Sequence, residues 1–280
     1  MASYLQFFLY FWLPYSISLS HMPKHPFHLV SPSPWPLFAA ISAFLIVCGL
    51  VLSWSSRGTW LLVLGVILLF ITCLKWWTNV ILESFYQGCH TKRVQSGLRL
   101  GIVLFIASEV FFFLGFFWAY LHCALSPNIE IGSSWPPLGL QSLSAFTIPL
   151  LNTVILLCSG ATVTWSHACL KDGLFLSCFF SLSTTVLLGL FFTLLQGYEY
   201  HSCSFCISDG AYGACFFLAT GFHGLHVLIG TCFLAINLMR LLGLHFTPAR
   251  HLGFEFSCWY WHFVDVVWIL LYLIVYIWGA

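Results

Sequence analysis

Two acidic side chains lie inside long apolar runs of the sequence, where an ionised group is hardest to accommodate. Glu109 lies within LFIASEVFFFLGFFW, and Asp265 lies within YWHFVDVVW, three residues after His262. A third run contains His223 and His226, which share one face if that run is helical. An ionised carboxylate in hydrocarbon costs on the order of 3 kcal/mol, so it needs a partner, a proton or a wet cavity. Carboxyl and imidazole groups at this spacing can exchange protons, join helices or bind metal.

Depth in the membrane decides which of these groups can meet. Counted at about 1.5 Å per residue from residue 98, Glu109 lies about 16 Å along its helix, close to the bilayer midplane. His226 lies near the middle of its own run, and Asp265 lies nearer the start of the last one. We therefore expect a buried polar cluster of Glu109, His223, His226 and Asp265 among three helices.

Three interpretations of this cluster stay open. The first is structural, with Glu109 protonated and neutral and with hydrogen bonds joining the helices. The second is proton handling or gating by Glu109, because intramembrane carboxylates often mark such paths. The third is metal or haem ligation by the histidines, although His223 and His226 on one helix face cannot supply the two opposite axial ligands of one haem.

The composition indicates which elements position these groups. Hydrophobic residues make up 60% of the 280 residues and charged residues 6%, against roughly 25% charged in a soluble domain. A formal net charge of +1 excludes nucleic-acid binding, since it gives no basic field. The apolar runs are long and do not alternate, which favours helices. The sequence predicts an all-α polytopic membrane protein with seven transmembrane helices, at about 36–54, 59–77, 98–122, 146–170, 174–197, 211–240 and 256–278.

The basic residues predict how these helices are inserted. With seven spans, all but one of the nine Lys and Arg fall on the N-terminal side of the membrane, and only Arg57 falls on the other. An excess of Lys and Arg marks the cytoplasmic or matrix side. We therefore expect the N-terminus on the matrix or cytoplasmic side.

Other features of the sequence are weaker evidence for a binding site or a helix contact. Cys203 and Cys206 form a CxxC in a polar connection, a weak signal for a disulfide or a metal clip. The GxxxG at 97–101 is as compatible with coincidence as with helix packing. The aromatic runs at 76–77 and 259–261 are typical of interfacial anchors. Residues 1–24 are expected to form an N-terminal extension, interfacial or packed on a partner, because their apolar stretch is too short to span.

From about residue 25 to its end, the chain resembles subunit III of the haem–copper cytochrome c oxidases. The similarity is densest in ISDGAYGACFFLATGFHGLHVLIGT and GFEFSCWYWHFVDVVW, at 207–231 and 253–268. It extends to HPFHLVSPSPWP at 25–36, SEVFFFLGFFWAYLH at 108–122 and PLLNT at 149–153. Long motifs in one order make this resemblance very specific.

The resemblance implies a function that depends on partners. Two helices at about 36–77 would be separated by a phospholipid-filled cleft from five at about 98–278, in one domain over 25–280. The chain would bind no cofactor besides structural phospholipids, and the haems and copper would lie in partner subunits. It would support stability and proton uptake of subunit I within complex IV of the mitochondrial inner membrane, with its N-terminus in the matrix. That complex transfers electrons from cytochrome c to oxygen and pumps protons.

The resemblance also implies roles for single residues. Glu109 falls on a buried, carbodiimide-reactive glutamate of the family. Arg240 matches an arginine that contacts a lipid phosphate, and Arg99, Trp76 and Trp77 are expected to contribute to lipid binding.

Departures from the family pattern mark where these roles are less secure. Thr78-Asn79 replaces an Arg-Asp pair, so one phospholipid contact is in doubt, and His167-Ala168 replaces a double histidine, which weakens a proton-collecting role there. The alternative function is a proton- or ion-coupled transporter that uses Glu109, although the sequence has no inverted repeats to favour it. A haem-binding membrane subunit is a third possibility.

Overall fold

The structure is a computed structural model, and it describes residues 25–129 and 132–279. Seven helices in this part of the chain are long and apolar enough to cross a membrane, and the same residues contain no strand. The predicted all-α, seven-span fold class is therefore confirmed. The expected extension at 1–24 lies outside the described residues. The elements are α2 (Trp35–Trp54), α3 (Trp60–Phe85), α4 (Lys92–Leu125), α5 (Ile148–Lys171), α6 (Phe175–Ser202), α7 (Ala211–Leu242), α8 (Leu252–Leu271) and the π-helix η2 (Tyr272–Trp278).

Several helices are longer than their apolar runs. The sequence predicts that a helix ends near residue 77, but α3 continues to Phe85, and α6 continues past the predicted end near 197 to Ser202. Hydropathy marks only the part of a helix that can lie in hydrocarbon, whereas the backbone hydrogen bonds continue into the polar turns beyond it. The added turns bring polar residues such as Glu83 and Glu199 onto helices.

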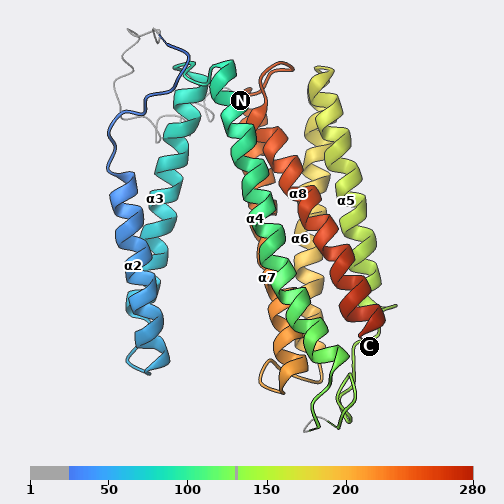
Figure 1. Cartoon of the computed structure of the whole chain (residues 1–280). Helices are drawn as coiled ribbons and strands as arrows, with labels where there is room; N and C mark the ends of the chain where they lie inside the picture. The colour runs from blue at the N-terminus through green and yellow to red at the C-terminus, as the bar shows by residue number, and fades with distance from the viewer. Residues whose placement is uncertain (1–24, 130–131, 280) are drawn as a thin grey trace. The chain divides into compact units, whose positions relative to one another are not determined.

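The chain divides into two compact units, residues 1–98 and 99–280, with the boundary inside α4. In the first unit, α2 and α3 form an antiparallel hairpin, seen in blue and cyan in Figure 1. A Cβ built on Gly49 would lie 2.5 Å from the Cα of Leu62, and one on Gly65 would lie 2.8 Å from the backbone nitrogen of Ile46. The two glycines therefore let the backbones of this hairpin approach closely.

The second unit is built from most of α4 together with α5, α6, α7, α8 and η2 (Figure 1). Its centre is Trp261 of α8, which is fully buried. The Trp261 ring lies against Gly189 of α6 and Gly230 of α7, and its indole nitrogen donates to Ser159 Oγ of α5 at 2.9 Å. One aromatic side chain thus joins four helices, and a side chain at either glycine would displace it.

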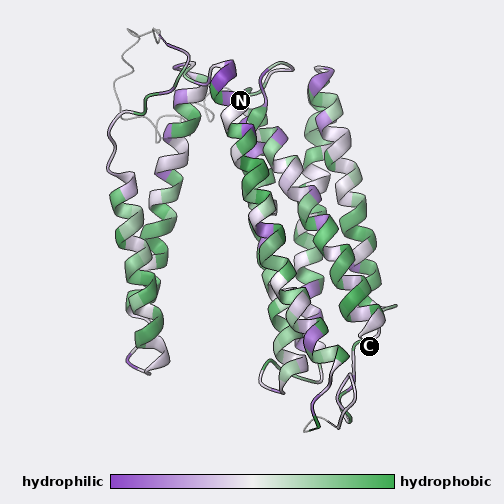
Figure 2. Cartoon of the chain, viewed as in Figure 1, coloured by the Kyte–Doolittle hydropathy of each residue, from purple (hydrophilic) through white to green (hydrophobic). Residues whose placement is uncertain are grey.

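Much of the helix surface is apolar. Figure 2 shows hydrophobic residues along the helices of each unit, with hydrophilic residues gathered mainly toward helix ends and connections. Large apolar side chains such as Phe111, Trp118 and Leu194 are more than two-thirds exposed. Such a surface suits lipid rather than water.

Candidate functional site

The closest carboxyl–imidazole contact within the spans joins α4 to α7. Glu109 Oε2 of α4 lies 2.9 Å from His226 Nε2 of α7. The Glu109 side chain is 22% exposed and the His226 side chain 10%, so the pair is largely, but not completely, buried. Phe113 packs edge-on against the His226 ring, with 5.0 Å between ring centroids. The pair is thus a polar contact set among aromatic side chains.

The hydrogen bonds of His226 fix how many protons this pair holds. His226 Nδ1 lies 2.6 Å from the carbonyl oxygen of Phe222, which can only accept, so Nδ1 carries a proton. Nε2 then either accepts a hydrogen bond from a neutral Glu109 carboxyl or, in an imidazolium, donates a hydrogen bond to a Glu109 carboxylate. In both forms one proton lies between Nε2 and the carboxyl, and the pair has no net charge. The contact is therefore stable in hydrocarbon and can hold or exchange a proton.

The second predicted histidine lies deeper in the bundle. His223 is fully buried, and its Nε2 lies 3.2 Å from the carbonyl oxygen of Val264 on α8. Nε2 is the donor, which leaves Nδ1 as an acceptor that has no hydrogen-bond partner in the described residues. The His223 ring also packs against the Trp268 ring in a tilted arrangement, at 5.0 Å between centroids. His223 thus links α7 to α8 rather than to Glu109.

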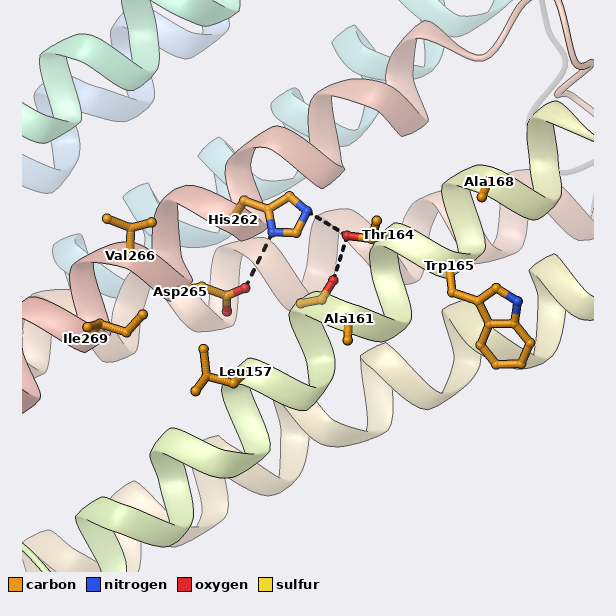
Figure 3. A pocket seen from close by; sticks show the side chains of 10 residues that line it. Leu157, Ala161, Thr164, Trp165, Ala168, His262, Asp265, Val266 and Ile269 are labelled. Carbon is orange, nitrogen blue, oxygen red and sulfur yellow. Dashed lines mark hydrogen bonds and ion pairs between the residues drawn. The ribbon is translucent and has the colours of Figure 1, made fainter.

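Asp265 makes its polar contact on another side of the bundle, toward α5. Figure 3 shows its carboxyl beside His262, with Oδ2 3.6 Å from His262 Nδ1. His262 Nε2 lies 3.1 Å from Thr164 Oγ1, and that hydroxyl donates to the carbonyl of Gly160 at 2.9 Å. The four predicted residues are thus distributed over two carboxyl–imidazole contacts and a separate buried histidine.

Sequence reasoning missed a buried carboxyl near the end of α6. The predicted span at 174–197 ends before Glu199, but α6 continues to Ser202 and Glu199 is 1% exposed. Its Oε1 accepts a hydrogen bond from the Tyr276 hydroxyl at 2.6 Å, and its Oε2 has no partner among the residues described. The available signal was Gln196, which is three residues before Glu199 and also buried, so that both lie on one inward face.

The basic residues proposed for lipid binding differ in their surroundings. The Arg240 guanidinium lies 4.5 Å above the Phe246 ring, and its Nη1 is 3.5 Å from the amide oxygen of Asn237. Burial and the neighbouring Arg240 charge lower the pKa of His245, in the connection after α7. By contrast, Arg99 Nη2 donates to Glu255 Oε2 at 3.1 Å. Arg240 therefore has only neutral polar contacts described, whereas the charge of Arg99 is balanced.

The aromatic runs have different surroundings. Trp77 of α3 is 58% exposed and Trp76 is partly buried. The prediction of an interfacial anchor at 259–261 is wrong for two of its three residues, since Tyr260 is 4% exposed and Trp261 is fully buried. The sequence pattern resembles a belt, but these residues face the centre of the bundle because Gly189 and Gly230 make room there.

The CxxC forms no disulfide, and the GxxxG makes no close helix contact, among the residues that the structure describes. Cys203 and Cys206 are both free thiols. Burial, together with the nearby Glu199, raises the pKa of the Cys203 thiol to about 11. Side-chain positions built on Gly97 and Gly101 would meet no heavy atom of the described chain within 4 Å. Among the residues that the structure covers, no group of three or more His, Cys, Asp or Glu is arranged to hold a metal ion.

Comparisons with known proteins agree with this architecture. The family model described as Cytochrome c oxidase subunit III matches residues 25–280. Cytochrome c oxidase subunit 3 of Gadus morhua is 53% identical over 256 residues, which cover 91% of this chain and 98% of that protein. The proteins of the same name from Danio rerio and Branchiostoma lanceolatum are 54% and 53% identical with the same coverage.

Fold and site together define a seven-helix membrane protein with carboxyl–imidazole contacts inside its spans. The chain belongs to the cytochrome c oxidase subunit III family. The resemblance found in the sequence is thereby confirmed. The alternative of a proton- or ion-coupled transporter is not favoured.

Proposed function

We propose that this chain is a non-redox core subunit of a cytochrome c oxidase, the respiratory complex IV. The observation that carries the proposal is the family match over 25–280, together with relatives named cytochrome c oxidase subunit 3 at about half identity over nearly their whole length. The chain supports the stability and proton uptake of the catalytic subunit I, which holds the haems and copper with its partners. This chain itself carries no catalytic centre.

The membrane we propose is the mitochondrial inner membrane, with the N-terminus in the matrix. Seven spans combined with the distribution of basic residues support this orientation, since Lys171 ends α5 and Arg240 lies in the last turns of α7, both on the N-terminal side. Only Arg57, between α2 and α3, falls on the opposite side.

Selective removal of the chain tests the non-redox role. We expect that an oxidase stripped of this chain keeps its haem optical spectrum but loses activity progressively during turnover. Reconstitution with the chain restores sustained turnover. A haem spectrum that leaves with the chain contradicts the proposal.

Phospholipid binding is part of the same proposal. Arg240 would receive a lipid phosphate, and Trp76 and Trp77 would pack on acyl chains. The neutral surroundings of the Arg240 guanidinium support this role. Arg99 would contribute only by sharing its charge between phosphate and Glu255.

Lipid analysis of purified complexes tests the Arg240 contact. Arg240→Leu is expected to reduce copurifying anionic phospholipid, whereas Arg250→Leu serves as a control because Arg250 is an exposed basic residue outside the helices. Equal lipid content in both variants contradicts the assignment.

The polar set of Glu109, His223, His226 and Asp265 has, in this proposal, a supporting role. Glu109 and His226 form a net-neutral contact that holds α4 on α7, and His223 joins α7 to α8. Asp265 contacts His262 within α8, and the His262 ring reaches Thr164 of α5. A single shared proton supports this role, because it avoids an uncompensated charge in hydrocarbon. Proton exchange through Glu109 would use the same proton.

A further inference from the structure

A groove lies on the surface of the second unit between α5 and α8, away from the Glu109–His226 contact. Figure 3 shows the side chains that line it, and its volume is about 640 Å³. Its apolar walls include Leu157, Trp165, Val266 and Ile269. From Leu157 to Ala168 it follows about 16 Å of α5, which is three helical turns. The groove is therefore long enough to accept a helix across part of the bilayer.

The floor of the groove is made of small residues. Gly160, Ala161, Thr164 and Ala168 of α5 all line it, and Gly160, Thr164 and Ala168 are each four residues apart. Small residues at this spacing allow the backbones of membrane helices to approach closely. This pattern alone would not define a site, but the groove also contains polar groups.

The second observation is a carboxyl at the groove with little hydrogen bonding of its own. Asp265 is 7% exposed, and its Oδ1 has no hydrogen-bond partner in the described residues. Its Oδ2 is 3.6 Å from His262 Nδ1, which is longer than a normal hydrogen bond. Asp265 lies about 20 Å along α8 from Leu252, at a depth where lipid offers only hydrocarbon. The carboxyl therefore lacks a close donor.

The neighbouring imidazole is unusually open for a residue within a span. The His262 side chain is 45% exposed, although α8 is the most buried of the seven spans. Lipid tails cannot form hydrogen bonds with these groups, and the apolar rim of Leu157, Val266 and Ile269 hinders water. A second helix can supply both close packing and a polar side chain, which is how polar groups join helices in membranes.

We propose that the α5–α8 groove is the docking site for a transmembrane helix of a partner subunit, which places a neutral hydrogen-bond donor at the Asp265–His262 pair. On the partner helix, the donor belongs to a side chain such as Ser, Thr, Asn, Gln or Tyr. A Lys or Arg donor would need a fully ionised Asp265 beside His262. The proposal rests on the proposed function, since it needs a neighbouring subunit.

A photo-crosslinking experiment in the intact complex tests the groove. Val266 lines the groove and is 56% exposed, and Leu187 of α6 is 65% exposed but does not line it. We replace each in turn by photo-reactive p-benzoylphenylalanine, irradiate the native membranes and analyse the adducts by mass spectrometry. Position 266 is expected to crosslink to a transmembrane segment of one partner subunit, and position 187 is not expected to crosslink to that segment. Adducts of position 266 with lipid alone overturn the proposal.

A filled groove provides an independent check. Ala161→Trp places a large side chain in the groove, whereas Ala161→Ser keeps it open. The crosslink from position 266 is expected to fall at least tenfold with tryptophan and to persist with serine, and an unchanged yield with tryptophan contradicts the proposal. If the Ala161→Trp chain fails to assemble, the crosslink from position 266 in the chain that keeps Ala161 still tests the proposal. Copurification of the unaltered chain with a haem-containing subunit separates failure of this inference from failure of the proposed function.

Discussion

Replacing Glu109 by Gln tests whether the proton shared with His226 is held by Glu109, so that both groups are neutral, and not by an imidazolium paired with a carboxylate. The Gln amide can donate to His226 Nε2 across the 2.9 Å that now separates it from Glu109 Oε2. A hydrogen bond is thereby kept, so we expect a loss of stability below about 1 kcal/mol. For a chain of this size, such a loss of stability lowers the thermal transition midpoint by less than about 4 °C.

Glu109→Leu removes the hydrogen-bonding partner instead of replacing it. His226 Nε2 is then left unpaired in a largely buried position, which costs roughly 1–3 kcal/mol. Ser108→Ala is the matched control on α4, because the Ser108 hydroxyl is exposed and bonds only to the carbonyl of Phe105 within its own helix. We expect the order of stability to be control, Gln variant, Leu variant.

The measurement is the temperature at which each variant chain dissociates from the purified complex, combined with infrared difference spectra of the carboxyl region. A protonated Glu109 contributes a carbonyl stretch that the Gln variant lacks. If the pair exists as an ionised salt bridge, Gln leaves a buried imidazolium uncompensated and costs about 3–5 kcal/mol. A Gln variant as unstable as the Leu variant, or one that fails to assemble, would show that the pair is ionised and would refute a neutral Glu109.

Two further predictions follow from single contacts. Gly160→Ala is expected to be less stable than Gly97→Ala by roughly 1 kcal/mol, because its Cβ would displace the end of the Asp265 side chain, whereas Gly97 has free space; equal midpoints contradict the α5–α8 contact. Alkylation by a maleimide should modify Cys206 before Cys203 near neutral pH, since the raised pKa of about 11 keeps Cys203 in its unreactive thiol form. Labelling of Cys203 should rise as the pH approaches that value, and rapid labelling at pH 7 would be inconsistent with its burial.

The seven spans could be predicted because each is a long, predominantly apolar run, and the basic residues at their ends supported the count. The ends of α3 and α6 could not be predicted, because hydropathy does not show whether a helix continues through polar residues after it leaves hydrocarbon. Glu199 was missed for this reason. The apolar run that predicts α6 ends at Gly197, but the next turn of α6 places the Glu199 carboxyl against Tyr276.

The depth of each polar residue in the membrane could be predicted, but the direction in which its side chain points could not. Counting residues along the helices put Glu109 and His226 at one level, where the structure has their 2.9 Å contact. The same counting gives no rotation about a helix axis, so Asp265 was expected with Glu109. Its direction toward α5 depends on Gly160, whose missing side chain leaves room for the carboxyl.

Identification of the chains that copurify with this protein tests the central claim most directly. The protein is isolated from native membranes through a C-terminal affinity tag, and its partners are identified by mass spectrometry and by the optical spectrum of the preparation. We predict a stoichiometric haem–copper subunit I, with haem absorbance present in the complex and lost from the chain after dissociation. A chain that is isolated alone, or that retains haem when separated from every partner, would contradict a non-redox subunit of cytochrome c oxidase.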